Sequence, residues 1–303
     1  MTLIKKLFIL ICVFFIIDYI VGLSLLQLSK ISQIRYSRLY YETMNADVLF
    51  VGNSRAINSF YPPYFEKLSN LKSFNLSYNG LTLPLVKLFI DDYLTRNQPP
   101  KMIFIEVTCI TDGYESLPNF KQYMFESSSL KQMLKEYYPE IYFTCKISKS
   151  YLFNSEYFLR TLYYLKKQDQ LWINRYTIKE DFYNNINIKD NAYKLALIEK
   201  SMMDIFIKMI ITYKKQGITL IPVLAPILDK CRDEESINTF INDFENKTQL
   251  KIVNLSNAIN DISMFADTIH TNDHGAYLIA KKLNELVLLK KTKSSNREGT
   301  TKK

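Results

Sequence analysis

Hydrophobic positions in this chain fall into short apolar runs that alternate with longer amphipathic stretches. Five runs of five to seven residues are largely apolar and predict buried strands: Ala46–Gly52, Lys72–Leu76, Met102–Val107, Ile218–Leu224 and Lys251–Leu255. Apolar residues at helical spacing predict helices over Leu83–Thr95, Leu195–Lys215, Glu235–Asn246 and Gly275–Leu289. We therefore predict an α/β fold with three layers (α/β/α) around a central parallel sheet of about five strands.

Residues 114–200 interrupt this alternation and predict an insertion. They are rich in Tyr, Phe and Lys, include the only tryptophan, Trp172, and have the pattern of helices. The simplest interpretation is a helical subdomain with the aromatic side chains in its core. Alternatively, exposed Tyr and Trp side chains would form a lid or a groove that stacks on a sugar chain or touches a membrane surface.

A longer apolar run near the N-terminus predicts a membrane-spanning helix. Lys5 and Lys6 precede the run, which extends over Leu7–Leu28. As a helix it is about 33 Å long, which matches the hydrocarbon thickness of a bilayer. We predict a transmembrane anchor over residues 1–30, followed by a linker over residues 31–45.

The orientation of this anchor follows from the basic residues at its two ends. A cleaved signal peptide would have a shorter apolar stretch and a small-residue cleavage site, to which Val21, Gly22 and Ser24 are a weak approximation. The lysines before the run favour a cytoplasmic N-terminus. Basic residues also follow the run and oppose that signal: Lys30, Arg35 and Arg38. We expect an uncleaved single-pass protein of the cytoplasmic (inner) membrane, with an extracytoplasmic catalytic domain.

Asp18 lies near the middle of the apolar run. A carboxylate at that depth costs about 2.5 to 3.5 kcal/mol on insertion scales. It is either a tolerated polar residue or one with a partner, for which contact with another membrane protein is the sharper hypothesis.

Composition and charge narrow the function classes. The chain has 303 residues, 48% of them hydrophobic and 23% charged, which is a globular composition. The net charge is +9, but residues 290–303 hold six Lys and Arg against one Glu. Because the excess lies on this segment, which we predict to be a disordered basic tail, it does not favour a nucleic-acid groove.

The four cysteines have no metal-like or disulfide-framework spacing: Cys12, Cys109, Cys145 and Cys231. We expect no metal and no cofactor.

Candidate chemistry lies just after the predicted strands, where the sites of parallel sheets form. Gly52-Asn53-Ser54-Arg55 follows the first strand. A serine on a tight turn there can act as a nucleophile beside backbone N–H groups that face an oxyanion. Serine is also a favoured helix N-cap, so this motif alone does not distinguish a nucleophile from a helix cap. Asn79-Gly80 follows the second strand, where a glycine suggests a special backbone conformation or a plain turn.

The segment Phe265–Ala276 holds both histidines of the chain. Asp267 stands three residues before His270, so its carboxylate can accept from the imidazole and fix its tautomer. The other ring nitrogen can then take a proton from a serine. The alternative is a surface loop in which Asn272 or Asp273 caps the final helix and His270 is solvated.

These blocks together resemble the SGNH or GDSL-type hydrolase superfamily. The matching elements are Gly52-Asn53-Ser54, Gly80 and Asp267-x-x-His270, and the resemblance covers roughly 46–289 without the insertion. The chain is most similar to membrane-anchored members with a G-x-S-R first block and a D-x-x-H-x-N-x-x-G last block. Such families serve the acylation of cell-envelope polymers, including proteins of alginate acetylation and of teichoic-acid D-alanylation.

The resemblance implies a flavodoxin-like fold and a role for each matching residue. Ser54 would be the nucleophile, His270 the general base and acid, and Asp267 its orienting carboxylate. The N–H groups of Ser54 and Gly80, with Asn79 beside them, would form the oxyanion hole. One element departs from the pattern, because the Asn that usually follows the third strand is absent from residues 105–112. A missing donor is worth about 2.7 to 4 kcal/mol of transition-state stabilisation, and Asn53, Asn79 or the Thr108 hydroxyl would be substitutes.

Three functions are compatible with this resemblance. The leading hypothesis is a membrane-anchored serine acyl-ester enzyme that passes an acyl group, with acetyl the first candidate, from Ser54 to a cell-envelope glycan hydroxyl. A second is an esterase, with water as acceptor. A third is a catalytically inert accessory subunit that binds a polymer or a membrane-bound O-acyltransferase. Such an acyltransferase is also the partner that the resemblance suggests for the Asp18-containing helix.

Overall fold

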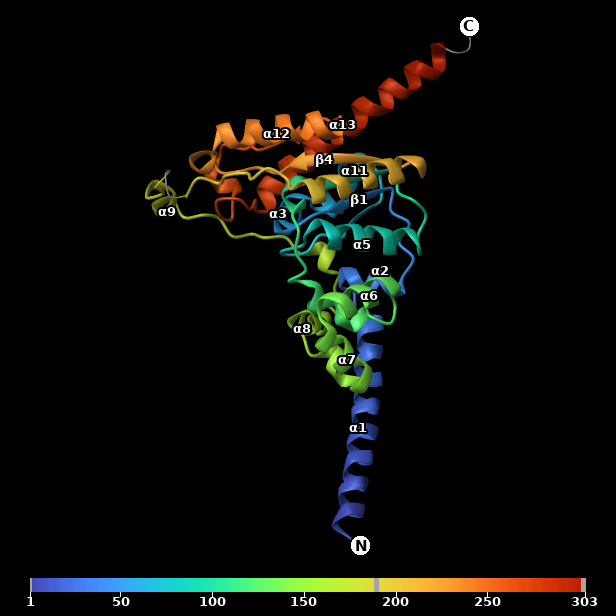
Figure 1. Cartoon of the computed structure of the whole chain (residues 1–303). Helices are drawn as coiled ribbons and strands as arrows, with labels where there is room; N and C mark the ends of the chain where they lie inside the picture. Colours follow the sequence, from blue (N-terminus) through green and yellow to red (C-terminus); the bar gives the residue numbers. More distant parts are fainter. Residues whose placement is uncertain (1, 188–190, 301–303) are drawn as a thin grey trace. The chain divides into compact units, whose positions relative to one another are not determined.

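A parallel sheet of five strands forms the core of one part of the chain. Helices lie along this sheet in Figure 1. The computed structural model describes residues 2–187 and 191–300, with side chains described as far as Leu289. The strand order is β2-β1-β3-β4-β5, and the strands are β1 Val48–Val51, β2 Ser73–Asn75, β3 Met102–Glu106, β4 Thr219–Leu224 and β5 Val253–Asn254. The predicted α/β class and five-stranded parallel sheet are confirmed.

The core explains why the strand runs show no alternation. All four residues of β1 are buried, because both faces of a central parallel strand are covered. Phe50 stacks on Phe104 of β3 with ring centroids 5.6 Å apart, and it meets Phe65 edge-on at 5.2 Å. Such pairs add to the stabilisation that burial itself provides.

The four predicted helices are α5 Leu83–Leu94, α11 Lys200–Lys215, α12 Glu234–Thr248 and α13 Asp273–Thr300. Two further helices, which the sequence pattern does not predict, follow β1: α3 Ser54–Ser59 and α4 Pro62–Ser69. Two boundaries differ from the sequence-based ones. Residues 195–199 precede α11 rather than beginning it. The backbone of α13 stays helical to Thr300, in the segment 290–303 that composition predicts as disordered; residues 301–303 lie outside the described residues.

The chain divides into two compact units. The sheet unit consists of Asn45–Lys87, Gln98–Gly113 and the residues from Gln170 onward. The helical unit consists of the residues up to Met44, together with Leu88–Asn97 and Tyr114–Asp169. This division differs from the predicted one, since the predicted insertion 114–200 contributes to both units.

The helical unit contains residues 31–44 of the predicted linker. Its elements are α1 Leu3–Ile31, α2 Arg35–Tyr41, η2 Leu117–Tyr123, α6 Ser128–Tyr137, α7 Pro139–Ile147, η3 Ser150–Phe153 and α8 Glu156–Tyr163. Tyr36 of α2 is fully buried, and its ring lies 4.4 Å from Phe89 and 4.7 Å from Phe120. Most of residues 32–40 are therefore buried in a core, which long-range aromatic contacts create and local sequence does not reveal.

Helix α1 is long and apolar enough to cross a membrane. Of the most apolar 18-residue stretch of this helix, only 11% is buried inside the protein. By length and composition α1 fits either a membrane span or a signal sequence.

Candidate active site

Ser54 occupies the turn between β1 and α3. Gly52 precedes it, and a Cβ atom at Gly52 would lie 2.8 Å from the Cβ of Ala56 and 2.9 Å from that of Glu106, so the turn requires glycine. Asn53 is the N-cap of α3, and its side-chain oxygen accepts from the Arg55 N–H at 3.0 Å. The capping role that the sequence leaves open for Ser54 thus belongs to Asn53. The Ser54 hydroxyl is left for another partner.

That partner is His270. Its Nε2 lies 2.8 Å from Ser54 Oγ, and its Nδ1 lies 2.8 Å from Asp267 Oδ2. The second carboxylate oxygen of Asp267 accepts from the N–H groups of Ile269 and His270, both at 2.9 Å. The structure therefore brings the three predicted residues into one hydrogen-bonded chain.

The final helix holds this loop in place. Asn272 is fully buried and accepts from the His274 N–H at 3.1 Å and the Gly275 N–H at 3.3 Å, which caps α13. Its amide donates to the Ser263 carbonyl at 2.7 Å. The alternative interpretation of this segment is correct about capping by Asn272. The His270 side chain, however, faces Ser54 and is 20% exposed.

The electrostatics favour an ionised Asp267. Partial burial would raise the pKa of this carboxyl, but the hydrogen bonds from the His270 ring and from two backbone N–H groups outweigh it and lower the pKa below its usual value. An ionised Asp267 favours the tautomer in which Nδ1 carries the proton. Nε2 is then free to accept from the Ser54 hydroxyl.

Asn79 and Gly80 lie in the loop that follows β2, and both are exposed. In the same loop the Tyr78 N–H donates to the Gly52 carbonyl at 3.3 Å. This bond places the loop beside the turn that carries Ser54. Their role in an oxyanion hole stays a prediction.

The segment after β3 takes part in a hydrogen-bond network that the sequence motifs do not predict. Asn53 Nδ2 donates to Thr108 Oγ1 at 2.9 Å, and the Thr108 hydroxyl donates to the Glu106 carboxylate. Glu106 also accepts from the Thr108 N–H at 3.0 Å. The Thr108 hydroxyl proton is thereby directed at Glu106 and away from any substrate oxyanion. Of the three substitutes considered, Thr108 is the least suited.

A buried arginine fixes the other side of the same turn. Arg55 is 1% exposed, and its Nη2 donates to the carbonyls of Ala225 at 2.5 Å and Pro226 at 3.1 Å, just after β4. Its Nε lies 3.8 Å from the fully buried Glu106 carboxylate. The sequence signal for this pair is an acidic residue that ends an apolar strand, together with an arginine directly after the candidate nucleophile.

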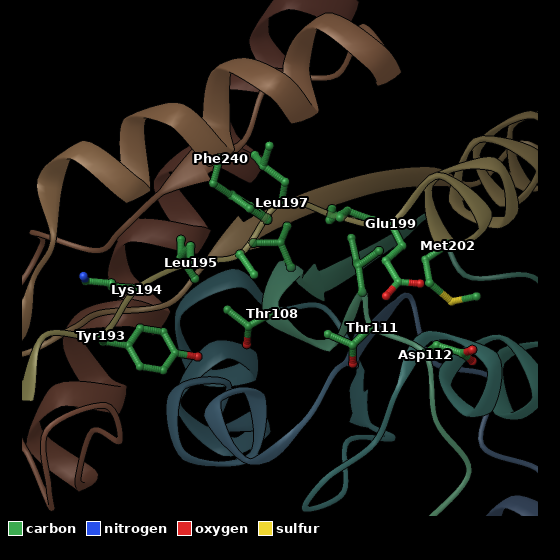
Figure 2. A pocket seen from close by; sticks show the side chains of 14 residues that line it. Thr108, Thr111, Asp112, Tyr193, Lys194, Leu195, Leu197, Glu199, Met202 and Phe240 are labelled. Atoms are coloured by element: carbon green, nitrogen blue, oxygen red, sulfur yellow. The ribbon is translucent and has the colours of Figure 1, made fainter.

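A pocket of about 330 Å³ adjoins this network (Figure 2). Thr108 belongs to both, and the Tyr193 ring, also in the pocket wall, lies 5.0 Å from the Arg55 guanidinium carbon. Most of the remaining lining is apolar, with Leu195, Leu197, Met202 and Phe240 among its side chains. Ser54, His270 and Asp267 are not among the residues that line it. Among the residues that the structure describes, no cluster of three or more His, Cys, Asp or Glu could hold a metal ion.

Comparisons with known proteins give distant likenesses only. No family model and no curated protein matches the sequence. Among solved structures, the chain is similar to a protein from Desulfitobacterium hafniense DCB-2 provisionally described as a lipolytic protein of the G-D-S-L family, with TM-score 0.40 and 9% identity, over 78% of this chain and 97% of that one. It is also similar to a provisionally described acylhydrolase from Bacteroides fragilis NCTC 9343, with TM-score 0.38 and 10% identity, over 80% and 86% of the two chains. At these scores neither likeness identifies the chemistry of this chain, which rests on the geometry of the site.

Proposed function

We propose that this protein is a membrane-anchored serine acyl-ester enzyme. The observation that carries the proposal is the unbroken hydrogen-bonded chain from Ser54 through His270 to Asp267. A serine at a parallel strand end, a histidine with one free nitrogen and an ionised carboxylate behind it are the parts that acyl transfer through a covalent intermediate requires.

The proposed reaction has two steps that share His270. Ser54 Oγ attacks the ester carbonyl carbon while His270 Nε2 takes its proton, and Asp267 stabilises the imidazolium that forms. His270 then gives that proton to the departing alcohol, which leaves an acyl group on Ser54. In the second step His270 removes a proton from water or from a glycan hydroxyl. The oxygen of that acceptor attacks the acyl group, and Ser54 regains its proton.

The proposed setting is the cell envelope, with an acetyl group as the first acyl group to test and a glycan as acceptor. Two features support it. Helix α1 has the length and apolar character of an anchor. In the sheet unit, Trp172 and Tyr176 are 47% and 58% exposed, which suits stacking of their rings on a sugar.

An inert accessory subunit is the second candidate. It is favoured by the absence of an Asn donor after β3, where Thr108 is already hydrogen-bonded to Glu106. Such a subunit would bind a polymer or a membrane-bound O-acyltransferase. The unbroken hydrogen bonds from Ser54 through His270 to Asp267 argue against an inert subunit.

Turnover of p-nitrophenyl acetate by the full chain in detergent separates these functions. Ser54→Ala and His270→Ala should each lower kcat by roughly 10⁴-fold or more. His274→Ala is the matched control, because His274 is the other histidine and is 74% exposed; it should keep wild-type activity. Acceleration by a free oligosaccharide would favour transfer over hydrolysis. Turnover no higher in the folded wild type than in Ser54→Ala would favour the accessory subunit.

A further inference from the structure

Asp18 in the apolar helix α1 is bound by a loop of its own chain. Its carboxylate accepts from the Ser148 hydroxyl at 2.6 Å and from the Lys149 N–H at 2.6 Å. The Ser150 N–H donates to it at 3.3 Å, and the Ser150 hydroxyl donates as well. One turn along, Gly22 approaches Lys149 so closely that any side chain there would overlap it. Residues 148–150, which follow α7 and include the first residue of η3, are thus held against the middle of α1.

The apolar surface of α1 extends past this contact. The part before Asp18, Leu3–Ile17, is about 22 Å long, whereas the hydrocarbon layer of a bilayer is about 30 Å thick. Beyond Asp18 the helix still exposes apolar side chains, such as Ile20 and Leu23. A bilayer that covers α1 over its full thickness therefore also reaches residues 148–150.

The helices on either side of this loop expose apolar pairs. Helix α7 ends at Ile147, directly before the loop, and Phe143 and Ile147 are 54% and 66% exposed. Helix α8 contacts α1 (Figure 1), and its Leu159 and Tyr163 are 66% and 63% exposed. Residues four apart share one face of a helix. Each pair therefore forms an exposed apolar stripe on its own helix.

Two lysines near these stripes have the arrangement that suits a lipid boundary. The Lys149 ammonium lies 4.2 Å from the centre of the Phe125 ring. The Lys167 ammonium lies 4.2 Å from that of Tyr163 and donates to its hydroxyl at 2.7 Å. Lysine stems lie along apolar surface while their charged ends reach water and headgroups.

We propose that α7, residues 148–150 and α8 form a membrane collar, which enters the outer part of the bilayer that α1 crosses. Phe143, Ile147, Leu159 and Tyr163 contact lipid in this arrangement, and the loop satisfies the Asp18 carboxylate inside the apolar layer. Asp18 then needs no second protein as its partner. The inference rests on the anchor of the proposed function and is independent of the triad.

Quenching of tryptophan fluorescence by brominated lipids tests the collar on the full chain. Trp172→Phe removes the only tryptophan, and single tryptophans are then introduced by Phe143→Trp or Leu159→Trp. Phe14→Trp in α1 is the positive control. Ile211→Trp in α11 of the sheet unit, at a site 51% exposed, is the matched negative control. The proteins are reconstituted into phosphatidylcholine vesicles whose acyl chains carry bromine near the headgroup or near the chain end.

The collar predicts that Phe143→Trp and Leu159→Trp lose emission strongly with bromine near the headgroup, and less with bromine near the chain end. Ile211→Trp should keep its emission with both lipids. If Phe14→Trp is quenched while both collar probes behave like Ile211→Trp, the anchor stands and the collar is refuted. A collar covered by a partner protein would give that same result in pure lipid. If Phe14→Trp also escapes quenching, the anchor fails and the collar with it. Because the two probes lie on different helices, misfolding of one variant leaves the other to decide.

Discussion

At the scale of single residues, Asn53 and Ser54 have different roles in the candidate site. Asn53 caps α3 through its oxygen and donates to Thr108 through its nitrogen. Ser54, the next residue, is thereby the first residue of the helix and directs its hydroxyl at His270. The cap orients Ser54, the proposed nucleophile, because it holds the backbone of that residue.

Two substitutions of Asn53 separate its two bonds. Asn53→Ala removes both, and we expect a loss of about 1 kcal/mol in unfolding free energy together with lower kcat. Asn53→Asp keeps an acceptor for the helix N–H but loses the donor to Thr108. It should retain most of the stability while lowering kcat, provided the Thr108 bond positions Ser54. Urea unfolding and ester turnover measure both effects, and wild-type kcat in Asn53→Ala would contradict this role.

Asp267→Asn tests the carboxylate behind His270. The amide oxygen can still accept from the backbone N–H groups, and the uncharged amide NH₂ then faces His270 Nδ1. The tautomer with the proton on Nδ1 is no longer favoured, so we expect kcat to fall by about 10⁴-fold. The same substitution should alter stability at low pH. The folded-state pKa of Asp267 is lowered. Its contribution is therefore fully present above the unfolded value of about 3.9 and is lost as pH falls through the folded value.

Unfolding free energies measured from about pH 5 downward give the outcome. The wild type should lose stability more steeply than Asp267→Asn below about pH 4. The effect should be modest because the Asp267 side chain is 52% exposed. Identical pH profiles would show that the carboxylate is not stabilised in the folded protein.

At the scale of elements, the sequence predicts strands and helices better than it predicts the contacts between the ends of different strands. The run Met102–Val107 predicts β3 Met102–Glu106 almost to the residue, because burial on both faces leaves a continuous apolar signature. Ser54 is likewise predictable from its position just after β1, and Asp267 and His270 from their three-residue spacing. The pairing of Glu106 with Arg55 leaves no periodic pattern in the sequence. The two residues come together only when β1, β3 and β4 align in the sheet.

The buried pair should matter far more to stability than an exposed one. Glu106→Leu removes the carboxylate but leaves Arg55 buried without its counter-charge and Thr108 without its acceptor. We expect a loss of about 3 to 5 kcal/mol. Lys101→Ala, which removes an exposed ion pair with Asp47 at 2.7 Å, should cost less than about 1 kcal/mol. Equal midpoints in urea for the two variants would show that the Glu106 network contributes nothing specific.

At the scale of the whole molecule, the sequence misplaces where the folded part begins. Residues 31–45 resemble a linker because they are short and lie between an apolar run and the first strand. In the structure Ile34, Tyr36 and Leu39 are at most 2% exposed. The rings that contact Tyr36 come from distant parts of the chain: Phe89, Phe120 and Tyr157. Such pairings have no local signature.

Two truncations measure what this segment contributes. A chain that starts at Ser32 lacks α1 but keeps α2, whereas one that starts at Ala46 also lacks the side chains of Ile34, Tyr36 and Leu39. Burial of each of these is worth about 1.5 to 3 kcal/mol, and their loss leaves an apolar gap in the helical unit. The chain from Ala46 should therefore melt well below the chain from Ser32 and bind a hydrophobic dye at lower temperature. Equal melting temperatures would mean that the helical unit does not depend on α2 for its core.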